Sequence, residues 1–219
     1  ERHIEMTETT KRTTKVWAHR GASAYAPENT LEAFALAVSQ KADGIELDVQ
    51  LTRDGVPVVI HDETIDRVTS KTGYVKDYTL KELKKLTVME KRFPAYPSSK
   101  IPTLEEVLDA VKASGIWVNI ELKTGIYWYP EIEQKVAQIV QKCDMEHRVI
   151  YSSFNHYSIQ KIKQIVPEAE TAYLYSDVIW NVTDYAKNTK VDGIHPAVYH
   201  IKMADFLNEY IKSGLNVRV

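Results

Sequence analysis

The stretch KVWAHRGASAYAPENTLEAFALAVSQKADGIELDV, residues 15–49, contains a strand, a helix and a second strand in succession. The two strand candidates, residues 15–19 and 44–49, are short, rich in branched or aromatic residues, and bounded by polar residues and glycine. Between them, residues 27–39 carry apolar side chains at three- and four-residue spacing, which is typical of one face of a helix. These side chains are Leu31, Phe34, Ala35 and Val38.

The same alternation continues along the rest of the chain. The further strand candidates are residues 56–61, 117–123, 149–153, 171–175, 192–195 and 216–219. The further helix candidates are residues 80–86, 104–113, 131–142, 158–166 and 203–212. Thr103 before Glu106 predicts a capping box at one helix start. Eight strands alternating with helices predict an α/β fold, a (β/α)8 TIM barrel, whose catalytic groups gather at the carboxyl ends of the strands.

Two regions depart from a regular barrel. The second and third strands are joined only by residues 52–56, and Asp54-Gly55 is typical of a tight hairpin, whereas a parallel neighbour needs a longer crossover. An insertion of about residues 62–100 follows the third strand, and the chain ends within the eighth. We therefore expect one domain over residues 15–219, with the far end of the barrel either missing or incomplete. Residues 1–14 are expected to be a disordered leader or tag remnant.

Composition limits the classes of partner. At 219 residues the chain can bury a core without disulfides, and its 28 basic and 30 acidic residues argue against a nucleic-acid-binding face. No apolar run approaches the ~18 residues of a membrane span, so no stable membrane insertion is expected. The single cysteine, Cys143, is predicted to be a packing residue. We expect a cytoplasmic monomer or homodimer, or a secreted protein if a leader was removed.

Three carboxylates form a candidate metal site. Glu46 and Asp48 are two residues apart on a strand, so their side chains share a face, and Glu121 repeats this placement on the fourth strand. Inside a barrel, unpaired carboxylates are costly unless a cation compensates them, and oxygen ligands favour one Mg²⁺ or Ca²⁺ over zinc. The alternative is that these side chains point outward into salt bridges.

Two histidines flank the carboxylates at matching strand ends. His19 and His61 each follow an apolar strand, and a pair of imidazoles there suits general acid and general base, because imidazole titrates near neutral pH. Arg20 can grip phosphate oxygens through its planar fork, while an ion pair with Glu28 is compatible with that role. Lys123 points the same way as Glu121, two residues earlier.

The chain resembles the glycerophosphodiester phosphodiesterases, specifically the bacterial, cytosolic type, over essentially all of its length after Lys15. The motifs that carry the resemblance occur in the family's order and at similar spacing. They are His19-Arg20-Gly21, Pro27-Glu28-Asn29-Thr30, Glu46-Leu47-Asp48, Thr52-Arg53-Asp54-Gly55, His61-Asp62 and Glu121-Leu122-Lys123. The family's Trp-Thr-x-Asn segment on the eighth strand would begin where this chain stops, at Val219.

The resemblance implies a (β/α)8 barrel with an insertion after the third strand, and hydrolysis of a small-molecule glycerophosphodiester to glycerol 3-phosphate and an alcohol with one divalent cation. It implies that His19 and His61 are the acid–base pair and that Arg20 and Lys123 contact the phosphate. The implied metal ligands are Glu46, Asp48 and Glu121. Two alternatives remain open. One is a lysophospholipase D-like activity on lysolipids, in which the aromatic residues 127–129 would contact the lipid, although these residues are equally compatible with loop packing. The other is a non-catalytic phosphodiester-binding barrel, if the carboxyl end is truly missing.

Overall fold

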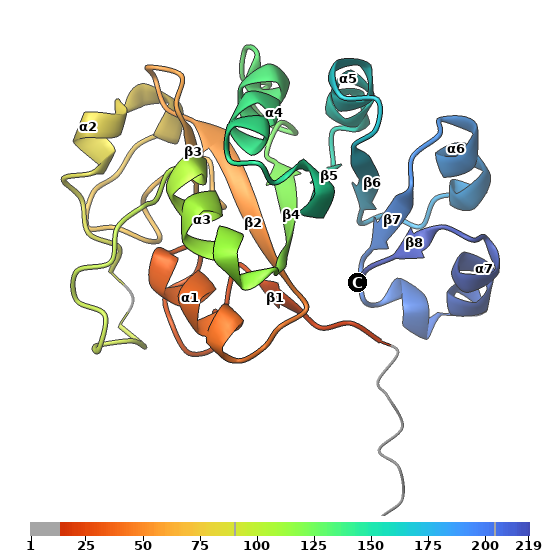
Figure 1. Ribbon diagram of the computed structural model, residues 1–219, viewed down its shortest axis with the longest axis horizontal. Coiled ribbons are helices and arrows are strands. Elements are labelled where there is room, and N and C mark those ends of the chain that lie inside the picture. The colour runs from red at the N-terminus through yellow and green to blue at the C-terminus, as the bar shows by residue number, and fades with distance from the viewer. Residues whose placement is uncertain (1–13, 90, 204) are drawn as a thin grey trace, which may run out of the picture.

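The structure is a computed structural model that describes residues 14–89, 91–203 and 205–219 (Figure 1). The strands are β1 (Trp17–His19), β2 (Gly44–Leu51), β3 (Pro57–Val59), β4 (Trp117–Leu122), β5 (Val149–Ser153), β6 (Glu170–Tyr175), β7 (Gly193–Pro196) and β8 (Asn216–Val217). The helices are α1 (Leu31–Ser39), α2 (Leu80–Leu83), α3 (Leu104–Val111), α4 (Ile132–Lys142), α5 (His156–Ile165), α6 (Val182–Asn188) and α7 (Phe206–Lys212). None of these helices combines the length and the apolar character that crossing a membrane requires.

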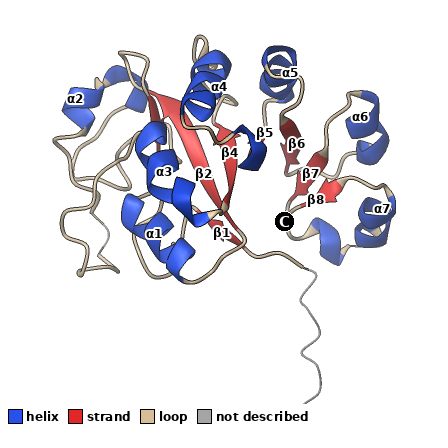
Figure 2. Ribbon diagram, in the orientation of Figure 1, coloured by secondary structure: helices blue, strands red, loops and turns tan. Residues whose placement is uncertain are grey.

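One curled sheet forms the centre of the molecule. Its strands follow the order β1-β2-β4-β5-β6-β7-β8, and every pairing along this path is parallel. The connecting helices lie around the outside of the sheet (Figure 2). Parallel strands with helical crossovers on the outer face are the arrangement of an α/β barrel, so the predicted fold class is confirmed.

The third strand is the exception, and its predicted place as a barrel strand was wrong. β3 pairs with β2 in the antiparallel direction, with Val59 opposite Val49. The connection is too short for a parallel crossover, and Gly55, at φ +74°, makes the tight turn that Asp54-Gly55 indicates. β3 therefore extends β2 as a hairpin, and β4 takes the parallel position beside β2.

The two ends of the sheet approach each other through a side chain. Among the described residues, β8 pairs with β7 and no strand pairing joins it to β1. Arg218, just after β8, places its guanidinium 5.4 Å from the centre of the Trp17 ring on β1. The same group donates a hydrogen bond to Glu170 on β6 at 2.6 Å. A cation–π contact thus lies where strand pairing would close the ring.

Local sequence signals set the helix starts. The predicted capping box is confirmed, because Thr103 and Glu106 exchange side chain–backbone hydrogen bonds at the start of α3. α1 begins at Leu31 rather than at residue 27, since Asn29 adopts φ +56° and Thr30 is the extended N-cap.

Helix α6 was not predicted. Its sequence, VTDYAKN, consists mostly of weak helix formers, so local propensity carries little signal there. Tertiary packing holds it instead through three buried side chains. These are Val182, Thr183 and Ala186.

The insertion after β3 has a hydrophobic core of its own. Val58 and Ile60 at the barrel edge pack with buried side chains of the insertion, apart from the main core of the barrel. The other side chains in this smaller core are Ile65, Val75, Leu83 and Val88 of the insertion and Ile101, which follows it. The insertion is therefore a packed lobe beside the end of β3, where His61 lies.

Candidate active site

Three carboxylates meet on the neighbouring strands β2 and β4. Glu46 and Asp48 are two residues apart on β2, so both side chains point to the same face. β4 lies beside β2 with Glu121 opposite Asp48, which brings the third carboxylate to the same place. One oxygen from each of the three lies within 4.8 Å of the others. The side chains that were expected to converge do so.

Burial makes this cluster electrostatically costly. Asp48 is 0 % exposed and Glu121 is 8 % exposed. Burial, followed by the negative charge of Asp48, raises the pKa of Glu121 to about 7. Burial and the charges of Asp48 and Glu121 also raise the pKa of Glu46 well above its ordinary value. Carboxylates that repel one another in a protein interior require compensating positive charge.

Arg20 and Lys123 supply part of that charge. Lys123 Nζ lies 3.1 Å from the Glu121 carboxylate and 4.0 Å from that of Asp48. Arg20 Nε lies 3.6 Å from Asp48. Its Nη1 pairs with Glu28 at 3.2 Å, so the ion pair considered beside the phosphate-binding role is present. One arginine therefore reaches both the carboxylate cluster and the motif that follows it in sequence.

The carboxylate oxygens of the cluster are suitable ligands for a divalent cation. Asp48 Oδ1 is buried and has no hydrogen-bond partner within the described part of the chain. The other oxygen, Oδ2, accepts a hydrogen bond from Asn29 Nδ2 at 2.9 Å, which orients the carboxylate. Clustered carboxylate oxygens are hard ligands that favour Mg²⁺ or Ca²⁺. Glu46, Asp48 and Glu121 are the residues that could hold such an ion.

His19 ends β1 beside Glu46. Its Nε2 lies 3.8 Å from the Glu46 carboxylate, and 70 % of its side chain is exposed. Desolvation on its protein side and the positive charge of Arg20 lower the pKa of His19. The chain then turns sharply, with Arg20 at φ +58° and Gly21 at φ +81°. A Cβ at Gly21 would meet Ala33 at 2.8 Å, so both backbone and space require glycine here.

His61 is held from two sides. The Gln50 Nε2 lies 3.3, 2.9 and 2.6 Å from the carbonyl oxygens of residues 60–62. Tyr129 donates its hydroxyl proton to Gln50 Oε1 at 2.6 Å. The Nδ1 of His61 lies 2.7 Å from the Asp62 carboxylate. Both the backbone and the ring of His61 are therefore oriented by buried or charged partners.

Three residues around the site had no role predicted for them: Asn29, Gln50 and Arg67. Gln50 continues the two-residue alternation that begins at Glu46, and Asn29 lies within a quoted motif, so both left a readable signal. Arg67 left none, because it is one basic residue in the insertion. Only the fold brings it to Asp62 and Glu28.

Other candidate residues lie outside this cluster. His156 is the first residue of α5, and its Nε2 hydrogen-bonds the Leu174 carbonyl oxygen at 2.9 Å. Burial lowers the pKa of His195, on β7, to about 3. Cys143 is buried, and burial raises its pKa to about 11. The predicted packing role of Cys143 is confirmed.

Known proteins are similar to this chain in sequence and in fold. Residues 19–219 match the Glycerophosphoryl diester phosphodiesterase family. A glycerophosphodiester phosphodiesterase of Caldanaerobacter subterraneus is 45% identical over 188 residues, which are 86% of this chain and 77% of the relative. One from Bacillus altitudinis is 44% identical over 201 residues, 91% of this chain and 81% of the relative.

A solved structure of a phosphodiesterase has the same fold as this chain. An Oleispira antarctica phosphodiesterase in complex with the product sn-glycerol-3-phosphate superposes with a TM-score of 0.84 at 29% identity. The match covers 93% of this chain and 83% of that one. The chain belongs to the glycerophosphoryl diester phosphodiesterase family of enzymes.

Proposed function

We propose that the protein hydrolyses glycerophosphodiesters to glycerol 3-phosphate and an alcohol, with one divalent cation and two histidines. The observation that carries the proposal is the meeting of Glu46, Asp48 and Glu121 within 4.8 Å of one another. The Oleispira relative, which holds sn-glycerol-3-phosphate, supports the same substrate class.

The three carboxylates are the proposed ligands of Mg²⁺ or Ca²⁺. When bound, such a cation offsets negative charge on the phosphate oxygens. Arg20 and Lys123, which lie against the same carboxylates, hold the phosphate from the protein side. Arg20 is the more directional of the two, because its fork is planar and Glu28 fixes one arm.

His19 and His61 are the proposed proton-transfer groups. One takes a proton from the nucleophile, either water or the neighbouring glycerol hydroxyl, as its oxygen bonds to phosphorus. The other gives a proton to the departing alkoxide as the second P–O bond breaks. The hydroxyl route passes through a cyclic phosphate that water then opens. Because Asp62 hydrogen-bonds His61 Nδ1, the other ring nitrogen, Nε2, is the atom that exchanges a proton with the substrate.

The test is turnover of glycerophosphocholine. We expect glycerol 3-phosphate, detected with glycerol-3-phosphate dehydrogenase, in the presence of Mg²⁺ or Ca²⁺. EDTA should abolish the product and added cation should restore it. Glu46→Gln, which keeps the side-chain volume and removes one ligand charge, should lose activity. Binding of glycerophosphocholine without any product would instead support the non-catalytic barrel.

A lysophospholipase D-like activity is the second candidate, and exposed apolar side chains favour it. The loops after β4 and β6, at the same end of the sheet as the carboxylates, expose Ile126 (70 %), Trp128 (47 %) and Trp180 (89 %). Trp side chains suit the boundary between water and an acyl chain. Lysophosphatidylcholine turned over faster than glycerophosphocholine, and slowed by Trp180→Ser, would establish it. If Trp180→Ser turned over lysophosphatidylcholine at the wild-type rate, the lysophospholipase D-like activity would be rejected.

A further inference from the structure

We propose that Arg67, in the insertion, is a positioning residue that holds His61 and Arg20 in working orientation through Asp62 and Glu28. The proposal deepens the phosphodiester hydrolysis proposed above and rests on it. It gives the insertion a part in catalysis, because it makes the orientation of two site residues depend on one side chain of that lobe.

The guanidinium of Arg67 is forked between two carboxylates. Its Nε and Nη2 donate to Asp62 at 2.8 and 3.1 Å. Its Nη1 and Nη2 donate to Glu28 at 2.9 and 2.7 Å. Any rotation of Arg67 breaks hydrogen bonds on both sides, so the distance between Asp62 and Glu28 is set by the width of one planar group.

The first arm leads to His61. Asp62 Oδ1 lies 2.7 Å from His61 Nδ1 and also accepts from Arg67 Nη2. The hydrogen bonds from Arg67 are the largest influence on the Asp62 carboxyl and lower its pKa to about 2. An ionised carboxylate at Nδ1 selects the tautomer that carries its proton there, which leaves Nε2 free for proton transfer.

The second arm leads to Arg20. Glu28 Oε1 accepts from Arg67 Nη2 at 2.7 Å and from Arg20 Nη1 at 3.2 Å, so two guanidinium groups share one oxygen. Without Arg67, the Glu28 side chain would lose two hydrogen bonds and could move together with the Arg20 guanidinium. Arg20 would then be drawn toward Asp48, whose Oδ2 is already 3.6 Å from its Nε. The phosphate-binding fork would lose its fixed orientation.

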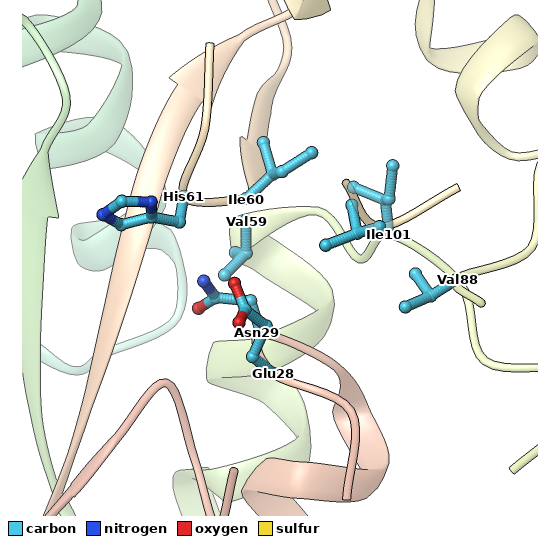
Figure 3. A pocket seen from close by; sticks show the side chains of 8 residues that line it. Glu28, Asn29, Val59, Ile60, His61, Val88 and Ile101 are labelled. Atoms are coloured by element: carbon cyan, nitrogen blue, oxygen red, sulfur yellow. The ribbon is translucent and has the colours of Figure 1, made fainter. Parts of the chain in front are cut away.

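The lobe that carries Arg67 packs tightly against the site. Ile65, two residues before Arg67, is fully buried in the insertion core. Figure 3 shows His61 and Glu28 on one side of a cavity, and Val88 of the insertion and Ile101, which follows it, on the other. The cavity that these side chains line holds about 10 Å³, room for roughly one water molecule. The insertion is therefore tightly packed where it carries Arg67.

A stabilising role alone does not account for this arrangement. The Arg67 side chain is 47 % exposed, and ion pairs that open to solvent contribute little to folding. Arg53 offers a matched control, since it is a similarly exposed arginine that pairs with Glu82 at 3.3 Å and bonds the Asp77 carbonyl oxygen. It makes the same kind of contact away from the two histidines.

The experiment measures kcat and KM for glycerophosphocholine, with the cation present, in the full chain. We expect Arg67→Met to lower kcat by about tenfold to a hundredfold, as misplaced catalytic groups do. Arg67→Lys should recover only part of this loss, because an ammonium cannot fork both carboxylates. Arg53→Met should keep the wild-type kcat. Thermal unfolding of each variant separates lost orientation from lost folding.

A double-mutant cycle with Asp62→Asn supplies the decisive readout. If Arg67 acts through Asp62 and Glu28, Arg67→Met should lower kcat by a smaller factor in the Asp62→Asn background than in the wild type, and by less than about twofold once Asp62→Asn and Glu28→Gln are combined. Losses that multiply, or a wild-type kcat in Arg67→Met, would overturn the proposal while leaving the phosphodiesterase function intact. Should Arg67→Met fail to fold, Arg67→Lys and Asp62→Asn complete the same cycle. An inactive wild-type protein would overturn both proposals.

Discussion

Replacing Glu121 with glutamine tests the electrostatic cost of the carboxylate cluster. Burial and then the charge of Asp48 raise the pKa of Glu121 to about 7, from an ordinary value of 4.5. Between these two pH values the folded, metal-free protein keeps a proton that the unfolded chain releases. The free energy of unfolding therefore falls as pH rises through this window. Each pH unit within this window lowers the free energy of unfolding by about 1.4 kcal/mol, so the whole window lowers it by about 3 kcal/mol.

The assay is urea unfolding in EDTA at pH 5, 6, 7 and 8. We expect the wild type to lose about 3 kcal/mol more than Glu121→Gln across this range, so that the variant is the more stable protein at pH 8. Glutamine keeps the side-chain size and still accepts a hydrogen bond from Lys123, which lies 3.1 Å from the Glu121 carboxylate. Glu105→Gln, at a surface carboxylate paired with Lys142, is the matched control.

Adding the cation should reduce the difference in stability between the wild type and Glu121→Gln. At one hundred times its Kd, Mg²⁺ or Ca²⁺ should raise the free energy of unfolding of the wild type by about 2.7 kcal/mol, and that of Glu121→Gln by less. Parallel pH curves for the wild type and Glu121→Gln in EDTA would contradict an electrostatic cost at Glu121. They would mean that Lys123 compensates the Glu121 charge in full.

Three further predictions concern the same site. His19→Ala and His61→Ala should each lower kcat on glycerophosphocholine at least ~10²-fold, through the loss of acid–base catalysis, and near-normal turnover would remove that histidine from the mechanism. Asn29→Ala should weaken cation binding by about tenfold in calorimetry, because Asp48 loses its orienting hydrogen bond, and an unchanged Kd would exclude that role. Gly21→Ala should lower the free energy of unfolding by more than about 1 kcal/mol, given φ +81° and the Ala33 contact at 2.8 Å; an unaltered Tm would show that the turn relaxes.

Several features were readable because they are local. The alternation of strands and helices, the capping box at Thr103 and the hairpin signal at Asp54-Gly55 each depend on neighbours within a few residues. The hairpin signal and the count of eight barrel strands conflicted, and the local signal was right about β3. Helix α6 was not predicted because its signal is not local. Its seven residues are helical through tertiary packing rather than through intrinsic helix propensity.

The available chemistry can be read from the order of residues along the chain: two histidines at strand ends, and a Glu-x-Asp pair whose two-residue period puts both carboxylates on one face. Which residues from distant parts of the chain meet these groups depends on the folded arrangement of the strands and the insertion. The β2–β4 register brings Glu121 opposite Asp48, and the packed insertion brings Arg67 to Glu28, 39 residues away. Register and lobe packing are collective properties of many buried contacts, and no short pattern encodes them.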